Sequence, residues 1–228
     1  TKDDRVIKTT PLDLMGQYNF IASEAIVARI AKETDPDYSA RCLDAAEKCL
    51  TWCKKSDKAL NPGTIGASIQ AALELYKTTG NVNHKEYAIT QATLLQSFRE
   101  TENVQGISGF FYNSTDQKTP YKNIWGGCTE FYIVCDLIQE FPEHENVLKW
   151  KEMITSYARD YLKVFITRNS FGIVPFGLYT GEDPGGNRKI GDYWYRYFMQ
   201  PELSWWVGIN SNVASAGIGL LKASVILN

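Results

Sequence analysis

The sequence is poor in histidine and contains no long apolar run. His84 and His144 are the only histidines, and both fall in segments that resemble polar turns, so we expect no zinc site. No apolar stretch approaches the roughly 20 residues that cross a bilayer. The opening residues 1–8 are too charged for a signal peptide. The sequence therefore predicts a chain without a metal and without a membrane span.

An excess of charge of one sign is also missing. The chain has 24 basic and 26 acidic side chains, and the two kinds are interspersed along its length. A protein that binds a polyanion normally carries a basic patch or stripe. We therefore expect no nucleic-acid partner.

Several motifs of common enzyme classes do not occur. No Gly-x-Ser-x-Gly elbow is present, which argues against a serine hydrolase. No predicted strand precedes a glycine fingerprint, so a Rossmann cofactor is not expected. The segment 183–187 is a strong turn signal, but no Gly-Lys-Ser/Thr follows it as in a phosphate-binding loop. We expect no cofactor.

Five cysteines cannot all pair within one chain. Their spacing places them on two helix faces, as Cys42, Cys49 and Cys53 on one helix and Cys128 and Cys135 on another. The pattern favours buried thiols that pack as small hydrophobic side chains.

The strongest pattern is a repeated helix hairpin. Apolar residues recur at helical spacing in pairs of segments joined by short turns. Thr10 and Pro11 are predicted as the N-cap and first residue of the first helix. The predicted helices span about 11–33 and 37–55, then 63–78 and 87–99, then 125–141 and 147–165, with an unpaired one at 207–227.

These hairpins predict a single all-α domain over residues 1–228. Small residues in the first helix of each hairpin and amphipathic second helices are typical of an α/α toroid, here a partial one of about three and a half hairpins. An open superhelix of the tetratricopeptide kind is the alternative. Because the connections differ greatly in length, whereas solenoid repeats keep a nearly fixed period, we favour the toroid.

The long segment 168–206 concentrates aromatic and polar residues. Ring faces stack on sugar rings while polar groups bind hydroxyls, so the segment indicates a carbohydrate ligand. The predicted substrate-binding residues are Asp192, Tyr193, Trp194, Arg196, Trp205, Trp206 and Asn210. The alternative is that the rings form a small core for the loop itself. At least one of the adjacent Trp205 and Trp206 is then buried packing.

A glycosidase needs two carboxylates at a set separation, which sequence spacing does not reveal. By position the candidates are Asp183, Asp192, Glu202 and Glu130. Each is equally compatible with a hydrogen-bonding loop residue or a surface charge, so the catalytic residues stay unassigned. Glu130 is the one expected to face the toroid axis, because glycines at 126 and 127 permit close approach.

Four segments carry a resemblance to glycoside hydrolase family 9, within the six-hairpin glycosidases. Residues 4–10 (DRVIKTT) and 35–43 (DPDYSARCL) resemble the middle of its catalytic domain. Residues 169–177 (NSFGIVPFG) and 205–212 (WWVGINSN) are similar to its closing aromatic loop. The resemblance covers nearly the whole chain. It implies a six-hairpin toroid and inverting hydrolysis of β-linked glucans.

The family's catalytic motifs do not occur in this sequence. Its Asp-Ala-Gly-Asp motif would precede Thr1, and its general-acid Glu and His-rich motif would follow Asn228. Only the aromatic loop carries over, as a substrate-lining segment. We therefore expect part of a polysaccharide-degrading hydrolase, inactive alone, with a periplasmic or extracellular location.

Two further expectations follow from an incomplete toroid. Exposed inner helices need cover, so we expect a second copy or a further chain segment to pack on them. The alternative functions are a non-catalytic module that binds oligosaccharide or polysaccharide, and a helical protein-interaction scaffold.

Overall fold

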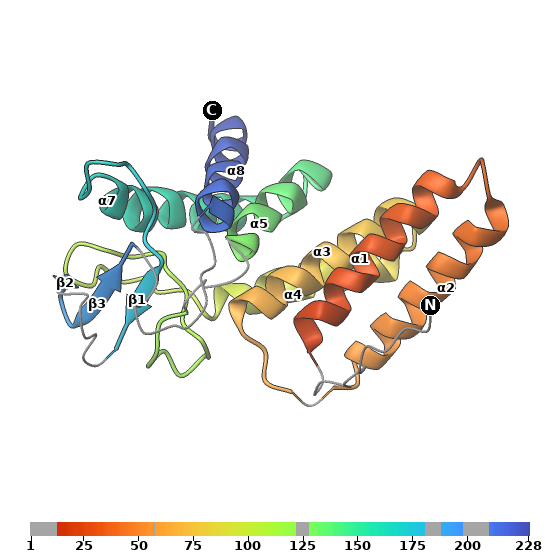
Figure 1. The fold of residues 1–228 in the computed structure, drawn as a ribbon, viewed down its shortest axis with the longest axis horizontal. Coiled ribbons are helices and arrows are strands. Elements are labelled where there is room, and N and C mark those ends of the chain that lie inside the picture. The colour runs from red at the N-terminus through yellow and green to blue at the C-terminus, as the bar shows by residue number, and fades with distance from the viewer. Residues whose placement is uncertain (1–12, 57, 122–127, 181–187, 198–209) are drawn as a thin grey trace, which may run out of the picture.

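The computed structural model describes residues 13–56, 58–121, 128–180, 188–197 and 210–228, with only the backbone of residues 210–212 (Figure 1). The chain is mostly helical. Its helices are α1 (Leu14–Ala31), α2 (Pro36–Cys53), α3 (Pro62–Thr79), α4 (Val82–Gln96), α5 (Thr129–Glu140), α6 (Val147–Ser156), the π-helical segment η1 (Tyr157–Leu162), α7 (Lys163–Ile166) and α8 (Asn210–Leu227).

Side-chain caps explain where the first four helices begin. Asp35 accepts a 2.9 Å hydrogen bond from the Tyr38 amide, and Asn61 accepts one of 3.0 Å from Thr64. Asp13 caps α1 in the same way, so the prediction of Thr10 as its N-cap is wrong. An oxygen that satisfies a free amide of the first turn stabilises a helix by about 1 kcal/mol.

The predicted start of the fourth helix is also wrong. α4 begins at Val82 and not near Tyr87, because Asn81 caps it directly after the left-handed Gly80. His84 therefore lies in the first turn of α4, where it is 3% exposed and its Nε2 is 2.8 Å from Oε1 of Glu47. His144 does lie in the predicted turn, with its ring stacked on Trp150.

The helices form three hairpins and a row. α1 packs on α2, α3 on α4, and α5 on α6, as predicted. α1, α3, α5 and α8 also contact one another in that order, so they make an inner row (Figure 1). The turns within hairpins are short. The longer connections join one hairpin to the next, and each of them leads to the first residue of an inner helix: α3, α5 or α8.

Glycines permit the close packing of the inner row. A Cβ on Gly66 of α3 would lie 2.9 Å from the backbone of Glu130 in α5. One on Gly219 of α8 would lie 2.5 Å from the ring of Phe131. The prediction that small residues bring the inner helices together is confirmed at these two contacts.

The core consists of two apolar clusters that share α3. Ala67, Ala71 and Leu75 pack with α1 and α2, whereas Ile65 and Ile69 pack with the larger cluster that includes α4 and α5. Both faces of α3 are therefore buried, and α3 joins the two clusters.

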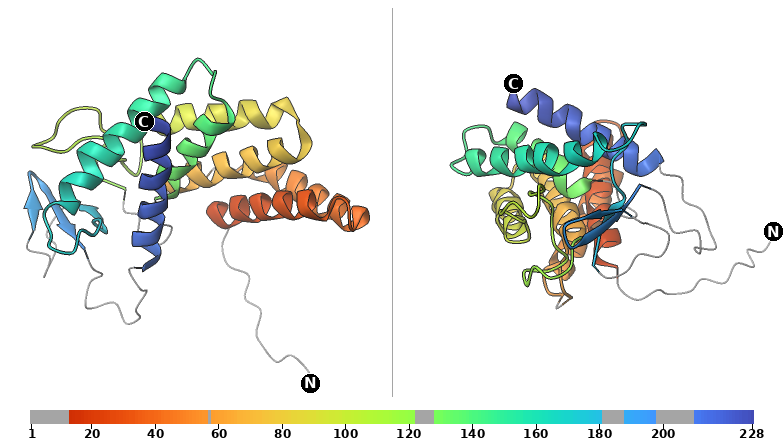
Figure 2. Two further views of the ribbon diagram at one scale, coloured as in Figure 1. Left: turned by 90° about the horizontal axis from the view of Figure 1, so that it is seen from above. Right: turned by 90° about the vertical axis from the view of Figure 1, so that its left-hand side faces the viewer.

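A small sheet, not predicted from the sequence, lies within the long aromatic segment. Strands β1 (Gly177–Tyr179), β2 (Lys189–Ile190) and β3 (Tyr193–Arg196) pair antiparallel in the order β1-β3-β2. Figures 1 and 2 place this sheet at the end of the molecule opposite α2. Strands of two to four residues carry no usable periodicity, which is why the sequence predicted only a loop.

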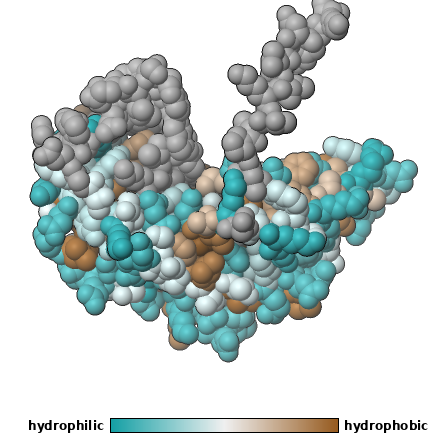
Figure 3. Space-filling model, turned by 90° about the horizontal axis from the view of Figure 1, so that it is seen from below, coloured by the Kyte–Doolittle hydropathy of each residue, from teal (hydrophilic) through white to brown (hydrophobic). Residues whose placement is uncertain are grey.

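The surface is largely hydrophilic on the face that Figure 3 shows, with separate apolar patches. Some exposed apolar side chains lie on α1 and α8, the first and last helices of the inner row. On α8 they form a stripe of Ile218, Leu221 and Val225. Within the described part of the chain, no helix has the length and apolar character to cross a membrane.

Candidate functional site

Four of the predicted ligand residues lie on or beside β3. Asp192 is exposed in the turn before the strand, and Tyr193 and Trp194 are half-buried. Arg196 is 5% exposed and its carbonyl accepts a 2.7 Å bond from Phe176. Because side chains alternate along a strand, Tyr193 lies on one face and Trp194 and Arg196 on the other. The predicted set is thus divided between two faces of the sheet.

Trp194 is partly covered by its neighbour in β2. Nζ of Lys189, the partner of Trp194 in the strand register, lies 5.3 Å from the centre of the indole ring. A cation above an indole face is held electrostatically, by about 0.5–1 kcal/mol at an exposed site. Trp194 therefore offers only part of its surface to a ligand.

The remaining predicted residues are not placed by the structure. Trp205 and Trp206 lie outside the described residues, as do the candidate acids Asp183 and Glu202. Asn210 begins α8, and its side chain is likewise outside the description.

Much of the aromatic segment is core. Phe176, Tyr179, Tyr195 and Tyr197 are all buried, and Tyr195 meets both Phe165 and Tyr197 edge to face. For these four rings the alternative interpretation, that the loop builds its own core, is confirmed.

Glu130 is buried and hydrogen-bonded. It is 1% exposed, and the Tyr157 hydroxyl donates a 3.1 Å bond to its Oε1. It therefore lacks the solvent exposure that an acid lining an open axis would have.

A hydrogen-bonded chain links β3 to the connection after α4. The Tyr193 hydroxyl lies 3.1 Å from that of Tyr112, which donates a 2.6 Å bond to Oε2 of Glu100. The Glu102 amide donates to the other oxygen of Glu100 at 2.8 Å. Burial, and then the bond to Glu100, raise the pKa of Tyr112 far above its usual value, so this phenol stays protonated.

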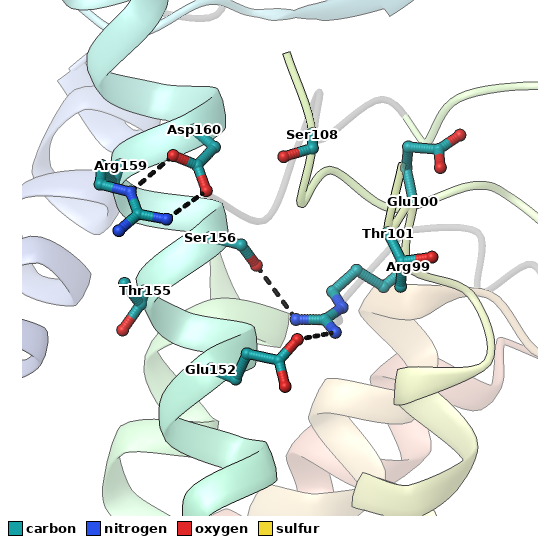
Figure 4. Close-up of a pocket in the computed structure, with 9 residues that line it drawn as sticks. All are labelled: Arg99, Glu100, Thr101, Ser108, Glu152, Thr155, Ser156, Arg159 and Asp160. Carbon is teal, nitrogen blue, oxygen red and sulfur yellow. Dashed lines mark hydrogen bonds and ion pairs between the residues drawn. The ribbon is translucent and has the colours of Figure 1, made fainter. Parts of the chain in front are cut away.

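Glu100 also lines a polar pocket of about 330 Å³ (Figure 4). One wall comes from the connection after α4 and the other from α6 and η1. The lining residues are Arg99, Glu100, Thr101, Ser108, Glu152, Thr155, Ser156, Arg159 and Asp160.

The two walls are held together at the end of α6 and in η1. The Ser108 amide donates a 3.2 Å bond to the Asp160 carbonyl. A Cβ on Gly109 would lie 2.5 Å from the backbone of Ser156, so only glycine fits there. Single π-helical turns occur frequently at functional sites. Here the turn lies directly beside the pocket.

The arginines of the pocket are each paired with an acid, but the three acids outnumber the two arginines. Arg99 spans the two walls, with Nη2 at 2.9 Å from Glu152 and Nη1 at 3.1 Å from the Ser156 hydroxyl, while its buried Nε makes no bond (Figure 4). Arg159 bonds Asp160 at 2.6 and 2.9 Å and lowers the pKa of that carboxyl. Three acids and two arginines line the pocket, and side chains of these kinds can hydrogen-bond hydroxyl groups.

The sequence did not indicate this pocket. It pointed to the aromatic segment 168–206, whereas the pocket residues come from 99–108 and 152–160. The local signal was the long aromatic connection 104–122, which contains Ser108, since loops of that length often carry function.

The described residues contain no group of three or more His, Cys, Asp or Glu side chains arranged to hold a metal ion. All five cysteines are free, and all but Cys49 are buried, which confirms the prediction of packed thiols.

No protein-family model matches the chain, and no curated protein is significantly similar to it.

Proposed function

We propose that this chain is a carbohydrate-binding portion of an α/α toroid, which takes part in binding or hydrolysis of a β-glucan-type polysaccharide. The observation that carries the proposal is the hydrogen-bonded chain from Tyr193 through Tyr112 to Glu100. It joins strand β3, within the aromatic segment predicted to bind the ligand, to a pocket of carboxylates, guanidinium groups and hydroxyls.

The helix arrangement supports this proposal. Alternating inner and outer helices, with the inner ones in a continuous row, are what a partial toroid requires. The long connections lead to the first residues of the inner helices, and ligand sites are commonly built from such loops on a rigid scaffold. The small sheet and one wall of the pocket are formed by these connections.

The test is binding of soluble β-glucan oligosaccharides, measured by calorimetry on the intact chain. Trp194→Ala should weaken binding roughly tenfold if the indole stacks on sugar. Trp52→Ala is the matched control, because Trp52 is a 45% exposed tryptophan on α2. Glu152→Ala tests the pocket, and Glu86→Ala, an exposed glutamate of α4, is its control. Unchanged affinity in both Trp194→Ala and Glu152→Ala would reject the site.

Product analysis separates binding from hydrolysis. The chain alone is expected to release no reducing sugar, because the described carboxylates of the pocket are paired with arginine or tyrosine and the family's acid motifs do not occur in the sequence. An enzyme would show turnover that Glu152→Ala or Glu100→Gln abolishes.

A second candidate function is protein interaction, for which the apolar stripe of α8 is the specific observation. Leu221 and Val225 are 70% and 72% exposed at helical spacing. A second copy of the chain or a further chain segment is our proposed cover. Light scattering of the chain and of Val225→Asp distinguishes the two: only a self-associating chain loses mass in the variant.

A further inference from the structure

A second pocket is formed by the segment after α7 and by the residues that flank β2 and β3, Arg188 and Tyr197. It has a volume of about 220 Å³, and Arg168, Phe171, Arg188 and Tyr197 contribute to its lining. Within the described ranges, neither arginine has a carboxylate within ion-pair distance. Arg29, Arg99 and Arg159 are each paired.

The two guanidinium groups rest on aromatic rings. Cζ of Arg188 lies 5.3 Å from the centre of the Tyr197 ring, and Cζ of Arg168 lies 6.0 Å from that of Phe165. A guanidinium on a ring face is held by its plane, while the N–H donors around its edge stay available. Both arginines are therefore oriented by a ring, and no acid among the described residues occupies their donors.

The rings beneath them form one rigid support. Phe165 is 0% and Tyr197 4% exposed, and the Tyr197 hydroxyl donates a 2.7 Å bond to the Phe165 carbonyl. Burial raises the pKa of Tyr197. Arg188 lies over the Tyr197 ring and Arg168 over the Phe165 ring, and this hydrogen bond joins the two residues that carry the rings. The two cations thus share one platform.

Asn169 fixes the loop that completes the pocket. Its Nδ2 donates to the carbonyls of Phe165 and Ile173 at 3.1 and 2.9 Å, and its Oδ1 accepts from the amides of Phe171 and Ile173 at 3.1 Å each. The backbone of Phe171 is therefore held in place while its ring is 82% exposed. A large ring presented to solvent at the rim of a pocket provides an apolar face for a ligand.

We infer that this pocket binds a carboxylate-bearing sugar, a uronic acid residue, with Arg168 and Arg188 on the carboxylate and the Phe171 ring against the apolar face of the sugar. Two planar donor forks match the geometry of a carboxylate, which forms strong bidentate bonds with arginine. The pocket is of a size for a single sugar ring. The inference rests on the proposed function, because both take the ligand to be a saccharide. It specifies in addition that one sugar of this ligand carries a carboxylate.

The experiment compares two probes by calorimetry on the intact chain: β-1,4-linked triglucuronic acid and cellotriose, which differ in their carboxylates. Triglucuronic acid is expected to bind at least about tenfold more tightly, and Arg188→Gln to weaken it by a similar factor. Arg41→Gln is the matched control, since Arg41 is an exposed arginine that lies 5.5 Å over the ring of Tyr38. Its affinity should equal that of the wild type.

Further arms separate the components of the site. Phe171→Ala should weaken triglucuronic acid but not inorganic sulfate, whereas Arg168→Gln should weaken both. Raising the salt from about 0.01 M to about 0.15 M should also reduce affinity, because exposed charges are screened.

Equal affinity for the two trisaccharides, or an unchanged affinity in Arg188→Gln, overturns the inference. Sulfate bound as tightly as the uronate would show a simple anion site and overturn the assignment to a sugar. Failure of the proposed function gives a different result. In that case cellotriose does not bind, or Trp194→Ala and Glu152→Ala leave its binding unchanged. The arginine-dependent preference for the uronate stands or falls separately.

Discussion

The Tyr112 hydroxyl donates a 2.6 Å hydrogen bond to Oε2 of Glu100 in the interior of the protein. Tyr112 is 3% and Glu100 9% exposed, so water does not readily replace this bond. Tyr112→Phe should lower the free energy of unfolding by about 1–3 kcal/mol, because a buried carboxylate loses a donor. Urea denaturation measures the change.

Tyr193→Phe is the control for that loss. The Tyr193 hydroxyl bonds to the Tyr112 hydroxyl and not to Glu100, so in this variant Glu100 keeps its bond from Tyr112. We expect a decrease below about 1 kcal/mol. If both variants lowered the free energy of unfolding equally, the loss could not be assigned to the bond from Tyr112 to Glu100.

Gly66 and Gly217 should respond in opposite directions to alanine. A Cβ on Gly66 meets backbone atoms of α5, which cannot rotate away, so Gly66→Ala should destabilise by roughly 1–3 kcal/mol. A Cβ on Gly217 meets nothing within 4 Å. Gly217→Ala should therefore stabilise α8 by up to about 1 kcal/mol. Thermal denaturation of both variants checks the signs, and stabilisation by Gly66→Ala would contradict the close approach of α3 to α5.

Glu74 should make stability fall in acid. Burial acts to raise its pKa, but hydrogen bonds from Arg29 and Lys77 outweigh it and hold the pKa below the ordinary value of 4.5. A lowered carboxyl pKa contributes stability above the unfolded value, and that contribution disappears as the pH falls through the folded value. The Glu74 contribution should therefore be lost below about pH 4.5.

Glu74→Gln tests this dependence. The variant should be less stable at neutral pH by roughly 1 kcal/mol and should approach the wild type in acid. Denaturation curves at several pH values measure it. A constant difference between the two proteins across that range would exclude ionisation of Glu74 as the cause.

The cysteines should react slowly with thiol reagents in the folded protein. Burial raises the pKa of Cys53 and of Cys135 to about 12, so at neutral pH almost no thiolate, the reactive form, is present. Cys49 is only partly buried and should react first. A chromogenic disulfide reagent should titrate one thiol in the native state and five in denaturant, and Cys49→Ala should remove the fast phase.

The predictable part of the fold is the part with strong local signals. The Asp-Pro and Asn-Pro pairs at 35–36 and 61–62 mark the starts of α2 and α3 to within a residue or two. α4 was placed too late because Val82, Asn83 and His84 resemble a turn after Gly80. The structure shows them as the first turn of α4, with Asn81 as the cap and with His84 in contact with Glu47 on α2.

The candidate site depended on contacts that sequence spacing does not contain. Tyr193 was predicted as a ligand residue, but its neighbour Tyr112 lies 81 positions away. Likewise, the pocket forms only because Ser108 pairs with Asp160 across 52 positions, and a π-helical turn has no recognised sequence signature. The many aromatic residues of the segment 168–206 indicated that it is more than a plain connection between helices. They did not indicate which of its rings are buried.

The double burial of α3 has a consequence for how the protein opens. Since α1 and α2 reach the rest of the molecule chiefly through one face of α3, they can detach as a unit while the larger cluster stays folded. Amide hydrogen exchange should then show two classes of protection, with lower free energies of opening in α1 and α2 than in α5. The amides of α3 should belong to the slow class, because α3 remains packed on α4 and α5 after the first hairpin has separated.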